Sequence, residues 1–204
     1  GNATRCVAWL LMEEGGAANR RIETPAGMLY AERAGPSLIT VDMGSPLLKW
    51  EEIPLSRAMD TARLDFSANG LDAPGAVNMG NPHVVFFVED VSGTPVARIG
   101  ASVEVDPLFP QRVNVGFAEV RGASQIRLRV WERGAGLTKA CGTGACAVAV
   151  AGVHVGLLDA HATLTLPGGD LRIAYEQGPK NGGGVRGRVV MTGTADDVCE
   201  GVWP

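Results

Sequence analysis

The spacing of apolar positions divides the chain into two helices and a series of short strands. Residues 142–157 are apolar on nearly every side, and a helix without a polar face must be surrounded by protein. Residues 2–13 predict a second helix, which ends at Gly15-Gly16. Clean alternation at 125–132 predicts a half-buried strand, and the continuous apolar run at 84–88 predicts a buried one. Further strands are expected at residues 20–23, 27–32, 37–42, 114–120, 164–166, 171–175 and 187–191.

The starts of the two helices resemble each other, which indicates two similar halves. When the two sequence segments are aligned, Gly1, Asn2, Val7 and Ala8 correspond to Gly142, Thr143, Val148 and Ala149. Many strands around an apolar helix, repeated twice, predict an α+β fold of two pseudo-symmetric halves. Each half is expected to be a strongly curved, mostly antiparallel sheet or barrel wrapped around a central apolar helix.

The break at Met43-Gly44-Ser45-Pro46 is the best boundary between these halves. Residues 1–43 with 191–204 are then the remainder of the N-terminal half, and residues 44–190 form the C-terminal half. The alignment also places a partner for Cys141 directly before Gly1. We therefore expect the chain to be a fragment whose preceding residue was a second cysteine.

Composition narrows the class of protein. Of the 204 residues, 46% are hydrophobic and 20% charged, which is typical of a soluble globular protein. The net charge of −4 argues against a nucleic-acid surface, and no apolar run is long enough to span a bilayer. There is no phosphate-binding GxxxxGK[ST] motif. The four cysteines form neither a CxxC pair nor a zinc-ligand spacing, which favours a reducing cytosolic compartment and no metal site.

Cys141 is the strongest candidate for chemistry. It stands where the glycine-rich turn Gly142-Thr143-Gly144 becomes a helix. The free N–H groups and the dipole of a helix start favour a thiolate, and they also hold a carboxylate or a phosphate. The alternative is a buried structural cysteine, and we expect this role for the other three, which are Cys6, Cys146 and Cys199.

Glu132 and Arg133 end a strand shortly before Cys141. Most such pairs are solvated ion pairs of little consequence. Near a thiol, however, the carboxylate can relay a proton or orient a substrate amine, and the guanidinium can bind a carboxylate in a forked geometry.

Asn81 and His83 flank a proline just before the buried strand at 84–88, which puts an amide and an imidazole on one loop. Imidazole is a natural base partner for a thiol, although a lone histidine is most often structural. Asn114, which opens its own strand, is either a further polar contact or a turn residue.

These segments resemble the signature motifs of diaminopimelate epimerases. The resemblance rests on Gly80–His83, Glu132–Thr138 and Ala140–Ala147, with support from Gly1–Cys6, Val41–Pro46 and Met191–Ala195. It implies a cofactor-independent epimerase that interconverts LL- and meso-diaminopimelate in the synthesis of lysine and peptidoglycan precursors. It also implies a cytoplasmic enzyme whose partner is a small-molecule substrate, and it is compatible with a homodimer.

The resemblance further implies a role for each candidate residue. One cysteine thiolate removes the α-proton and a second thiol delivers a proton to the opposite face, with Cys141 as one of the pair. Glu132 and His83 lie near the two thiols. The helix-start contacts to the reacting carboxylate come from Gly1, Asn2, Gly142 and Thr143, and the grip on the distal end comes from Asn81, Asn114 and Arg133. Without a second cysteine, the chain alone is expected to be inactive.

Three alternatives remain at this point. A racemase of the same fold that acts on proline or hydroxyproline would be separated by a panel of substrates. A non-catalytic module that binds a small carboxylate would need no activated thiol, so slow alkylation of Cys141 near neutral pH would favour it. A thiol redox protein is disfavoured because CxxC is absent from the sequence.

Overall fold

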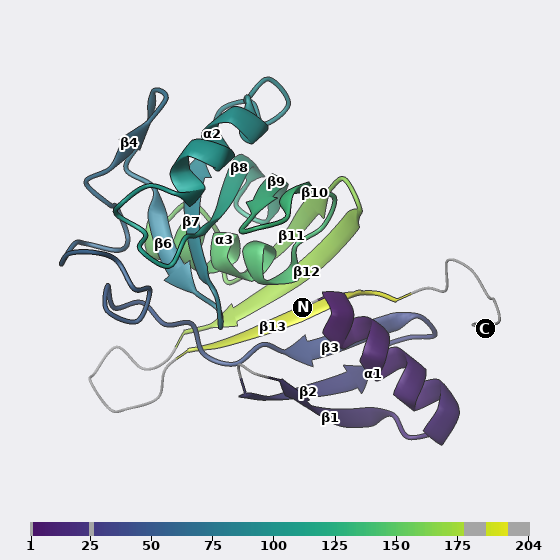
Figure 1. Cartoon of the computed structure of the whole chain (residues 1–204). Coiled ribbons are helices and arrows are strands. Elements are labelled where there is room, and N and C mark those ends of the chain that lie inside the picture. The colour runs from purple at the N-terminus through teal and green to yellow at the C-terminus, as the bar shows by residue number, and fades with distance from the viewer. Residues whose placement is uncertain (1, 25–26, 178–186, 196–204) are drawn as a thin grey trace, which may run out of the picture.

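The computed structural model describes residues 2–24, 27–177 and 187–195, in which helices pack on an eleven-stranded sheet (Figure 1). The helices are α1 (Asn2–Gly15), α2 (Val96–Glu104) and α3 (Gly142–His154). The strands are β1 (Asn19–Thr24), β2 (Gly27–Arg33), β3 (Leu38–Asp42), β4 (Ser67–Ala68), β5 (Leu71–Asp72), β6 (Gly75–Asn78), β7 (Pro82–Phe87), β8 (Asn114–Gly122), β9 (Gln125–Glu132), β10 (Gly136–Thr138), β11 (His161–Leu166), β12 (Gly169–Glu176) and β13 (Arg188–Thr194).

The predicted α+β fold is confirmed, and one sheet runs through both parts of the molecule. One part contains α1 with β1, β2 and β3, and the other contains α3 with β6–β12. The strand order is β1-β2-β3-β13-β12-β11-β9-β8-β7-β6, with β10 paired to β9 and a separate β4-β5 hairpin. The pairs are antiparallel except β11 with β9 and β7 with β8. Within the described residues the sheet is open, because β1 and β6 stand at its two ends. The strand β13 joins the parts, since it pairs with β3 on one side and β12 on the other.

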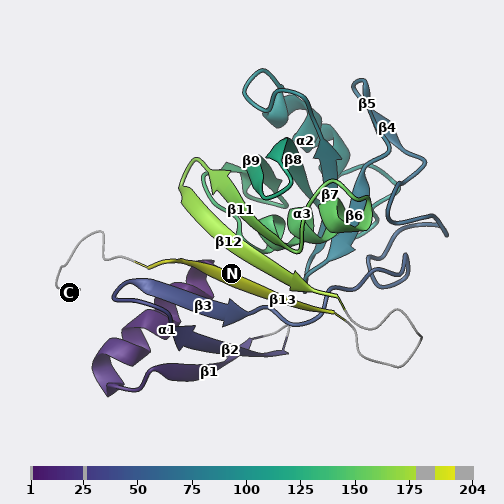
Figure 2. The same cartoon turned by 180° about the vertical axis from the view of Figure 1, so that it is seen from behind.

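Helix α3 is the enclosed helix that its sequence predicts. It contacts β6, β7, β8, β12 and β13, and Figures 1 and 2 show strands around it from both sides. Its buried residues include Ala145, Cys146, Val148 and Val150, so the absence of a polar face is explained by contact on every side. The helix ends at His154 rather than at the predicted residue 157, and the chain then turns at Gly156, whose φ is +75°.

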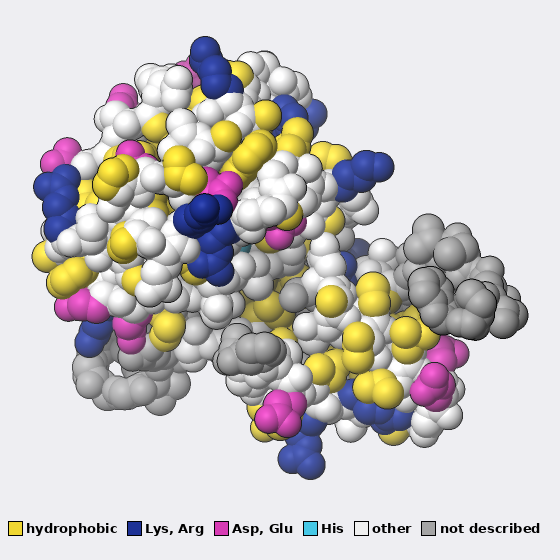
Figure 3. All heavy atoms as spheres, in the orientation of Figure 1, with side chains coloured by type: hydrophobic (Ala, Val, Ile, Leu, Met, Phe, Trp, Pro, Cys, Tyr) yellow, Lys and Arg dark blue, Asp and Glu magenta, His cyan; other side chains and the backbone are white. Residues whose placement is uncertain are grey.

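Helix α1 covers one face of β1, β2 and β3 through buried Ala8 and Met12. Its other side is open, with Leu10 46% and Val7 44% exposed, and Figure 3 shows hydrophobic side chains gathered over this helix. The expectation that Cys6 is a core residue is therefore wrong, because Cys6 is exposed on this helix. The same expectation is confirmed for Cys146, which is buried, while Cys199 lies outside the described residues.

Helix α2 was not predicted. Its apolar residues Val96, Ile99 and Val103 recur at helical spacing and are buried over β8 and β9, so the signal was present but short. They belong to a second core, separate from the core around α3, in which the rings of Phe86 and Phe117 stack with centroids 5.9 Å apart. This second core supports the strands that lead into the candidate site.

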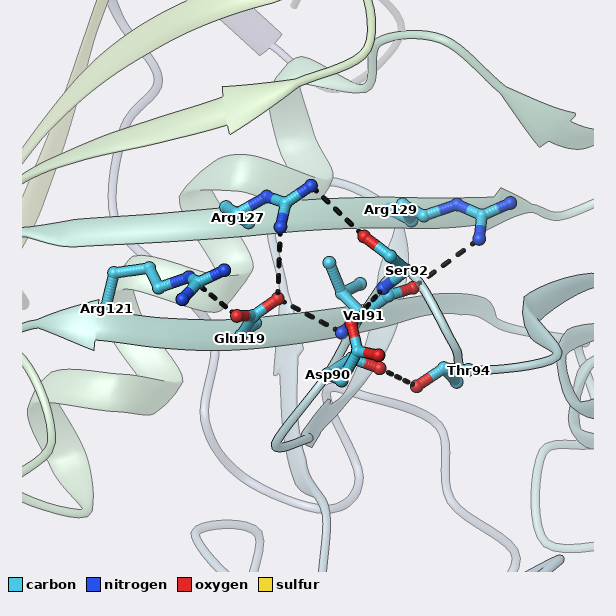
Figure 4. A network of polar contacts seen from close by, with 8 residues as sticks. All are labelled: Asp90, Val91, Ser92, Thr94, Glu119, Arg121, Arg127 and Arg129. Carbon is cyan, nitrogen blue, oxygen red and sulfur yellow. Dashed lines mark hydrogen bonds and ion pairs between the residues drawn. The ribbon is translucent and has the colours of Figure 1, made fainter.

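A polar network fixes the turn before α2 to the outer face of β8 and β9 (Figure 4). The buried carboxylate of Glu119 accepts the Val91 N–H at 3.1 Å and pairs with Arg121 at 2.6 Å and Arg127 at 3.7 Å. The guanidinium of Arg127 also donates to the Ser92 hydroxyl at 3.1 Å. Because both arginines are about half exposed, solvent weakens these ion pairs, and the bond from Glu119 to the turn is the firmest part of the network.

Candidate active site

The starts of α1 and α3 meet at one cavity between the two parts of the sheet. The Asn2 side-chain amide donates to the carbonyl of Ala140, just before α3, at 3.1 Å. Thr4 of α1 and Thr143 of α3 both line a cavity of about 530 Å³. Its other lining residues are Thr24, Met28, Leu29, Met43, Gly44, Ser45, Leu47, Met79, Gly80 and Asn81. The sequence therefore located both helix starts, although Gly1 itself lies outside the described residues.

Asn2 is held in place by a residue that the sequence reasoning missed. Buried Arg5, one turn along α1, donates from Nη1 to the Asn2 side-chain oxygen at 3.2 Å. Its Nε donates to the carbonyl of Thr194 in β13 at 3.3 Å. An arginine in the first turns of a predicted helix was the available signal, because a charged group is rarely buried without partners.

Cys141 stands at the N-cap of α3 with extended backbone, and its residue is only 4% exposed. Its Sγ lies 3.7 Å from the Thr143 hydroxyl. Burial, followed by the negative charge of Glu132, raises the pKa of the thiol to about 11. The Gly144 N–H and the Thr143 hydroxyl act in the opposite direction but with smaller effect. Burial and the Glu132 charge thus oppose the activated thiolate expected from the helix start, and we expect Cys141 to carry its proton at neutral pH in this conformation.

Glu132 reaches Cys141 from the end of β9. The turn that follows requires left-handed backbone at Gly134 (φ +75°) and Gly136 (φ +81°), which glycine adopts without strain. The turn brings β10 back along β9, and the Thr138 hydroxyl donates to the Glu132 carboxylate at 2.5 Å. The carboxylate is thereby oriented beside the thiol whose pKa it raises.

Asn114 joins the loop of Arg133 to strand β7. Its buried side chain accepts the backbone N–H of Arg133 at 3.0 Å and donates to the carbonyl of Pro82 at 2.8 Å. The Arg133 guanidinium, on an exposed residue, donates to the carbonyl of Gln111 at 2.9 Å. Asn114 therefore sets where the Arg133 backbone lies, and the guanidinium retains further N–H groups for a ligand.

His83 is buried on β7, directly beside Asn114 in the neighbouring strand. Its Nε2 lies 3.0 Å from the Asn81 side-chain oxygen. Burial, with a smaller effect from the positive charge of Arg133, lowers the pKa of His83 to about 3. The imidazole is accordingly neutral at neutral pH and holds Asn81, which lines the cavity.

Of the predicted site residues, two line this cavity, and the others described are not among its lining residues: Asn2, His83, Asn114, Glu132, Arg133, Cys141 and Gly142. The lining residues are Asn81, whose side-chain oxygen lies 3.0 Å from Nε2 of buried His83, and Thr143, whose hydroxyl lies 3.7 Å from Sγ of buried Cys141. Sequence reasoning missed Glu104, whose carboxylate holds the turn after Glu132. In the described part of the chain, no group of three or more His, Cys, Asp or Glu side chains is placed to hold a metal ion. No helix in the same ranges is both long and apolar enough to cross a membrane.

Sequence comparison gives a match to a family model and to named relatives. The family model described as "Diaminopimelate epimerase" matches residues 75–198. A protein of Phenylobacterium zucineum named diaminopimelate epimerase is 52% identical over all of this chain and 72% of its own length. One of the same name from Caulobacter sp. K31 is 49% identical over 95% of this chain and 66% of its own length. The chain thus spans roughly two thirds of the length of these relatives.

Solved structures with a similar fold have different names. A hydroxyproline epimerase from Agrobacterium vitis, with bound trans-4-hydroxy-L-proline, superposes with a TM-score of 0.65 over 95% of this chain and 63% of its own, at 18% identity. A phenazine biosynthesis protein of the PhzF family from Bacillus anthracis has a TM-score of 0.59 over 91% of this chain and 69% of its own, at 12% identity. At these identities the likeness concerns the fold alone.

Proposed function

Because this chain belongs to the diaminopimelate epimerase family, we propose that the protein produced from its gene interconverts LL- and meso-2,6-diaminopimelate by moving the proton of one α-carbon without a cofactor. The enzyme is an isomerase acting on an amino acid, in the synthesis of lysine and peptidoglycan precursors. The observation that carries this proposal is the meeting of two helix starts at one cavity, with Cys141 at the start of one of them.

The two helix starts suit the difficult step of this reaction. Removing an α-proton leaves negative charge that spreads onto the α-carboxylate, and no cofactor is invoked to accept it. Free N–H groups and the positive ends of two helix dipoles stabilise such charge when they are fixed before the reaction. Asn2, Gly142 and Thr143 are the described residues at these starts, and we assign to them the contacts to the reacting carboxylate.

Cys141 is the proposed acid and base on one face of the α-carbon. With a pKa of about 11, its thiol begins protonated and delivers a proton to the carbanion. In the reverse direction it must first lose that proton, and the positive charge of the substrate ammonium would favour the thiolate. The start of α1 also borders the cavity, and a second thiol belongs there in a two-cysteine mechanism.

Glu132 and His83 support the proton transfer in different ways. Glu132, oriented by the Thr138 hydroxyl, is placed to exchange a proton with Cys141 and to attract the substrate ammonium. His83 is neutral, and through Nε2 it orients Asn81 at the wall of the cavity. We assign to Asn81, Asn114 and Arg133 the recognition of the distal amino-acid end, with Asn114 acting by fixing the Arg133 backbone.

The test measures turnover and exchange of the α-proton in the protein as it is produced from its own gene. LL-diaminopimelate in heavy water should gain deuterium at one α-carbon and yield the meso isomer. Cys141→Ser should lower kcat by roughly 10² to 10⁴-fold, because a hydroxyl is a far weaker acid and base than a thiol. Cys6→Ser is the matched control, since Cys6 is an exposed thiol and its replacement should leave turnover unchanged.

Two outcomes would contradict the proposal. Turnover of proline or hydroxyproline in place of diaminopimelate would transfer the function to the racemase alternative. Tight binding of diaminopimelate with no exchange of its α-proton would indicate the carboxylate-binding module. The raised pKa of Cys141 means that slow alkylation alone no longer separates an enzyme from a binding module.

We also propose that the enzyme is cytoplasmic and that it forms a homodimer. Cys6, Cys141 and Cys146 are free thiols, which agrees with a reducing compartment. The homodimer is proposed from the family resemblance, without a contact in the structure that supports it. Sedimentation of the protein expressed from its own gene tests the assembly, and fractionation of its source cells tests the compartment.

A further inference from the structure

Glu104 closes α2 with its carboxylate buried behind the turn that carries Glu132 and Arg133. The residue is only 6% exposed, although glutamate is among the residues that are seldom buried. One carboxylate oxygen accepts the backbone N–H of Gly134 at 3.0 Å, and the other accepts the Trp131 indole N–H at 2.7 Å. Glu104 thus bonds the residue before Glu132 and the residue after Arg133.

The Trp131 side chain is held between α2 and this turn. A Cβ added to Gly100 of α2 would lie 2.4 Å from the Trp131 Cβ, so the helix backbone lies directly against this residue. A Cβ at Gly136 would meet the far edge of the indole at 3.5 Å. Packing therefore fixes the ring, and the bond to Glu104 fixes the direction of its N–H group.

Both oxygens of Glu104 are needed for this arrangement. The indole and the backbone amide are both donors, so the side chain between them must offer two acceptors, which a carboxylate does and an amide does not. The hydrogen bond from Trp131 holds the pKa of Glu104 below its ordinary value, so the acceptor form persists at neutral pH. Arg112 lies 3.6 Å away but is 61% exposed, so it contributes little.

We propose that Glu104 is a positioning residue for epimerisation, which fixes the turn after β9 so that Glu132 faces Cys141 and Arg133 faces the substrate. The inference rests on the proposed function for its effect on turnover. Two hydrogen bonds fix the backbone of this turn at neighbouring residues, since Asn114 accepts the N–H of Arg133 and Glu104 accepts the N–H of Gly134. Loss of one of these hydrogen bonds lets the turn move, and small displacements of reacting groups lower rates steeply.

The deciding variant is Glu104→Gln, which keeps the size of the side chain but has one acceptor instead of two. We expect kcat/KM for diaminopimelate to fall about tenfold or more. We also expect the pH midpoint for alkylation of Cys141 to move to lower pH, because the Glu132 charge that opposes ionisation would no longer be held beside the thiol. A residue that merely stabilises the fold would not move that midpoint.

Glu119→Gln is the matched control, because Glu119 is also buried but serves the outer turn before α2. It should lower stability and leave both the midpoint and kcat/KM at wild-type values. If folded Glu104→Gln matches Glu119→Gln in both measurements, the inference is overturned. Should Glu104→Gln not fold, Trp131→Phe removes the indole donor while keeping a ring in place, and the same two measurements decide.

Failure of the inference and failure of the proposed function give different results. If the wild-type protein does not epimerise diaminopimelate, the proposed function is lost, but the alkylation midpoint still reports whether Glu104 places Glu132 beside Cys141. If the wild-type enzyme is active and the midpoint and turnover of Glu104→Gln are unchanged, only the positioning role is lost.

Discussion

Two opposing effects act on the thiol of Cys141, and an alkylation experiment decides which is larger. The helix start favours the thiolate, whereas burial and the Glu132 carboxylate favour the thiol. We predict that burial and the Glu132 carboxylate together outweigh the helix start in the unliganded protein. Cys141 should therefore react far more slowly with iodoacetamide than an ordinary cysteine does at the same pH.

The magnitude follows from the raised pKa. A change from the ordinary value of 9.0 to about 11 corresponds to about 2.7 kcal/mol against the thiolate. Near pH 8, about one thiol in a thousand is then ionised, compared with about one in ten for the ordinary value, and the rate falls by about 100-fold because only the thiolate reacts. Limited access to the buried sulfur lowers the rate further but does not shift the pH midpoint.

The assay follows alkylation of each cysteine separately by mass spectrometry of its peptide, over a pH series. Exposed Cys6 supplies the reference for an accessible thiol on the same chain. In Glu132→Gln, the loss of the neighbouring charge should move the Cys141 midpoint to lower pH. Glu119→Gln should not move it, because that carboxylate serves the outer turn on β8 and β9.

A Cys141 midpoint near pH 7 in the wild-type protein, with a plateau above it, would refute this reasoning. The helix start would then outweigh both burial and the carboxylate. A midpoint near 11 that is insensitive to Glu132→Gln would refute the electrostatic part alone and leave burial as the cause.

Three further predictions concern the surroundings of the site. The pKa of His83 is about 3 in the folded protein and about 6.5 in the unfolded chain, so between these values the unfolded chain binds more protons. As the pH is lowered through this range, the free energy of unfolding should fall by up to about 1.4 kcal/mol per pH unit. In His83→Gln, the free energy of unfolding measured by urea titration should depend less steeply on pH. Gly100→Ala should lower the free energy of unfolding by about 1–3 kcal/mol in the same titrations, because the added Cβ has no room. Gly122→Ala should lower it little, because no atom lies within 4 Å of the added Cβ. Equal losses in the two variants would contradict the packing argument. Asn114→Ala should raise KM for diaminopimelate and lower stability by about 1–3 kcal/mol, because it frees the Arg133 loop, and an unchanged KM would remove Asn114 from substrate recognition.

Several elements were readable from the sequence because their signals are local. The apolar run after Cys141 required an enclosed helix, and alternation at residues 125–132 required a half-buried strand, which the structure has as β9. Helix α2 was missed because its stripe of three apolar residues is too short to outweigh the surrounding glycines and prolines. Cys6 was misassigned to the core because residues near it on α1 are apolar, although that side of the helix is exposed.

The sequence by itself determined which groups are available at the site and where along the chain they stand. A cysteine at a helix start, a Glu-Arg pair after a strand and an Asn-Pro-His loop are all short motifs, and each depends on neighbours within a few residues. Only the tertiary structure decided their protonation states and their positioning. Burial of Cys141, the approach of Glu132 and the support from Glu104 depend on residues far apart in sequence, and the energy of a charge depends on what surrounds it in space.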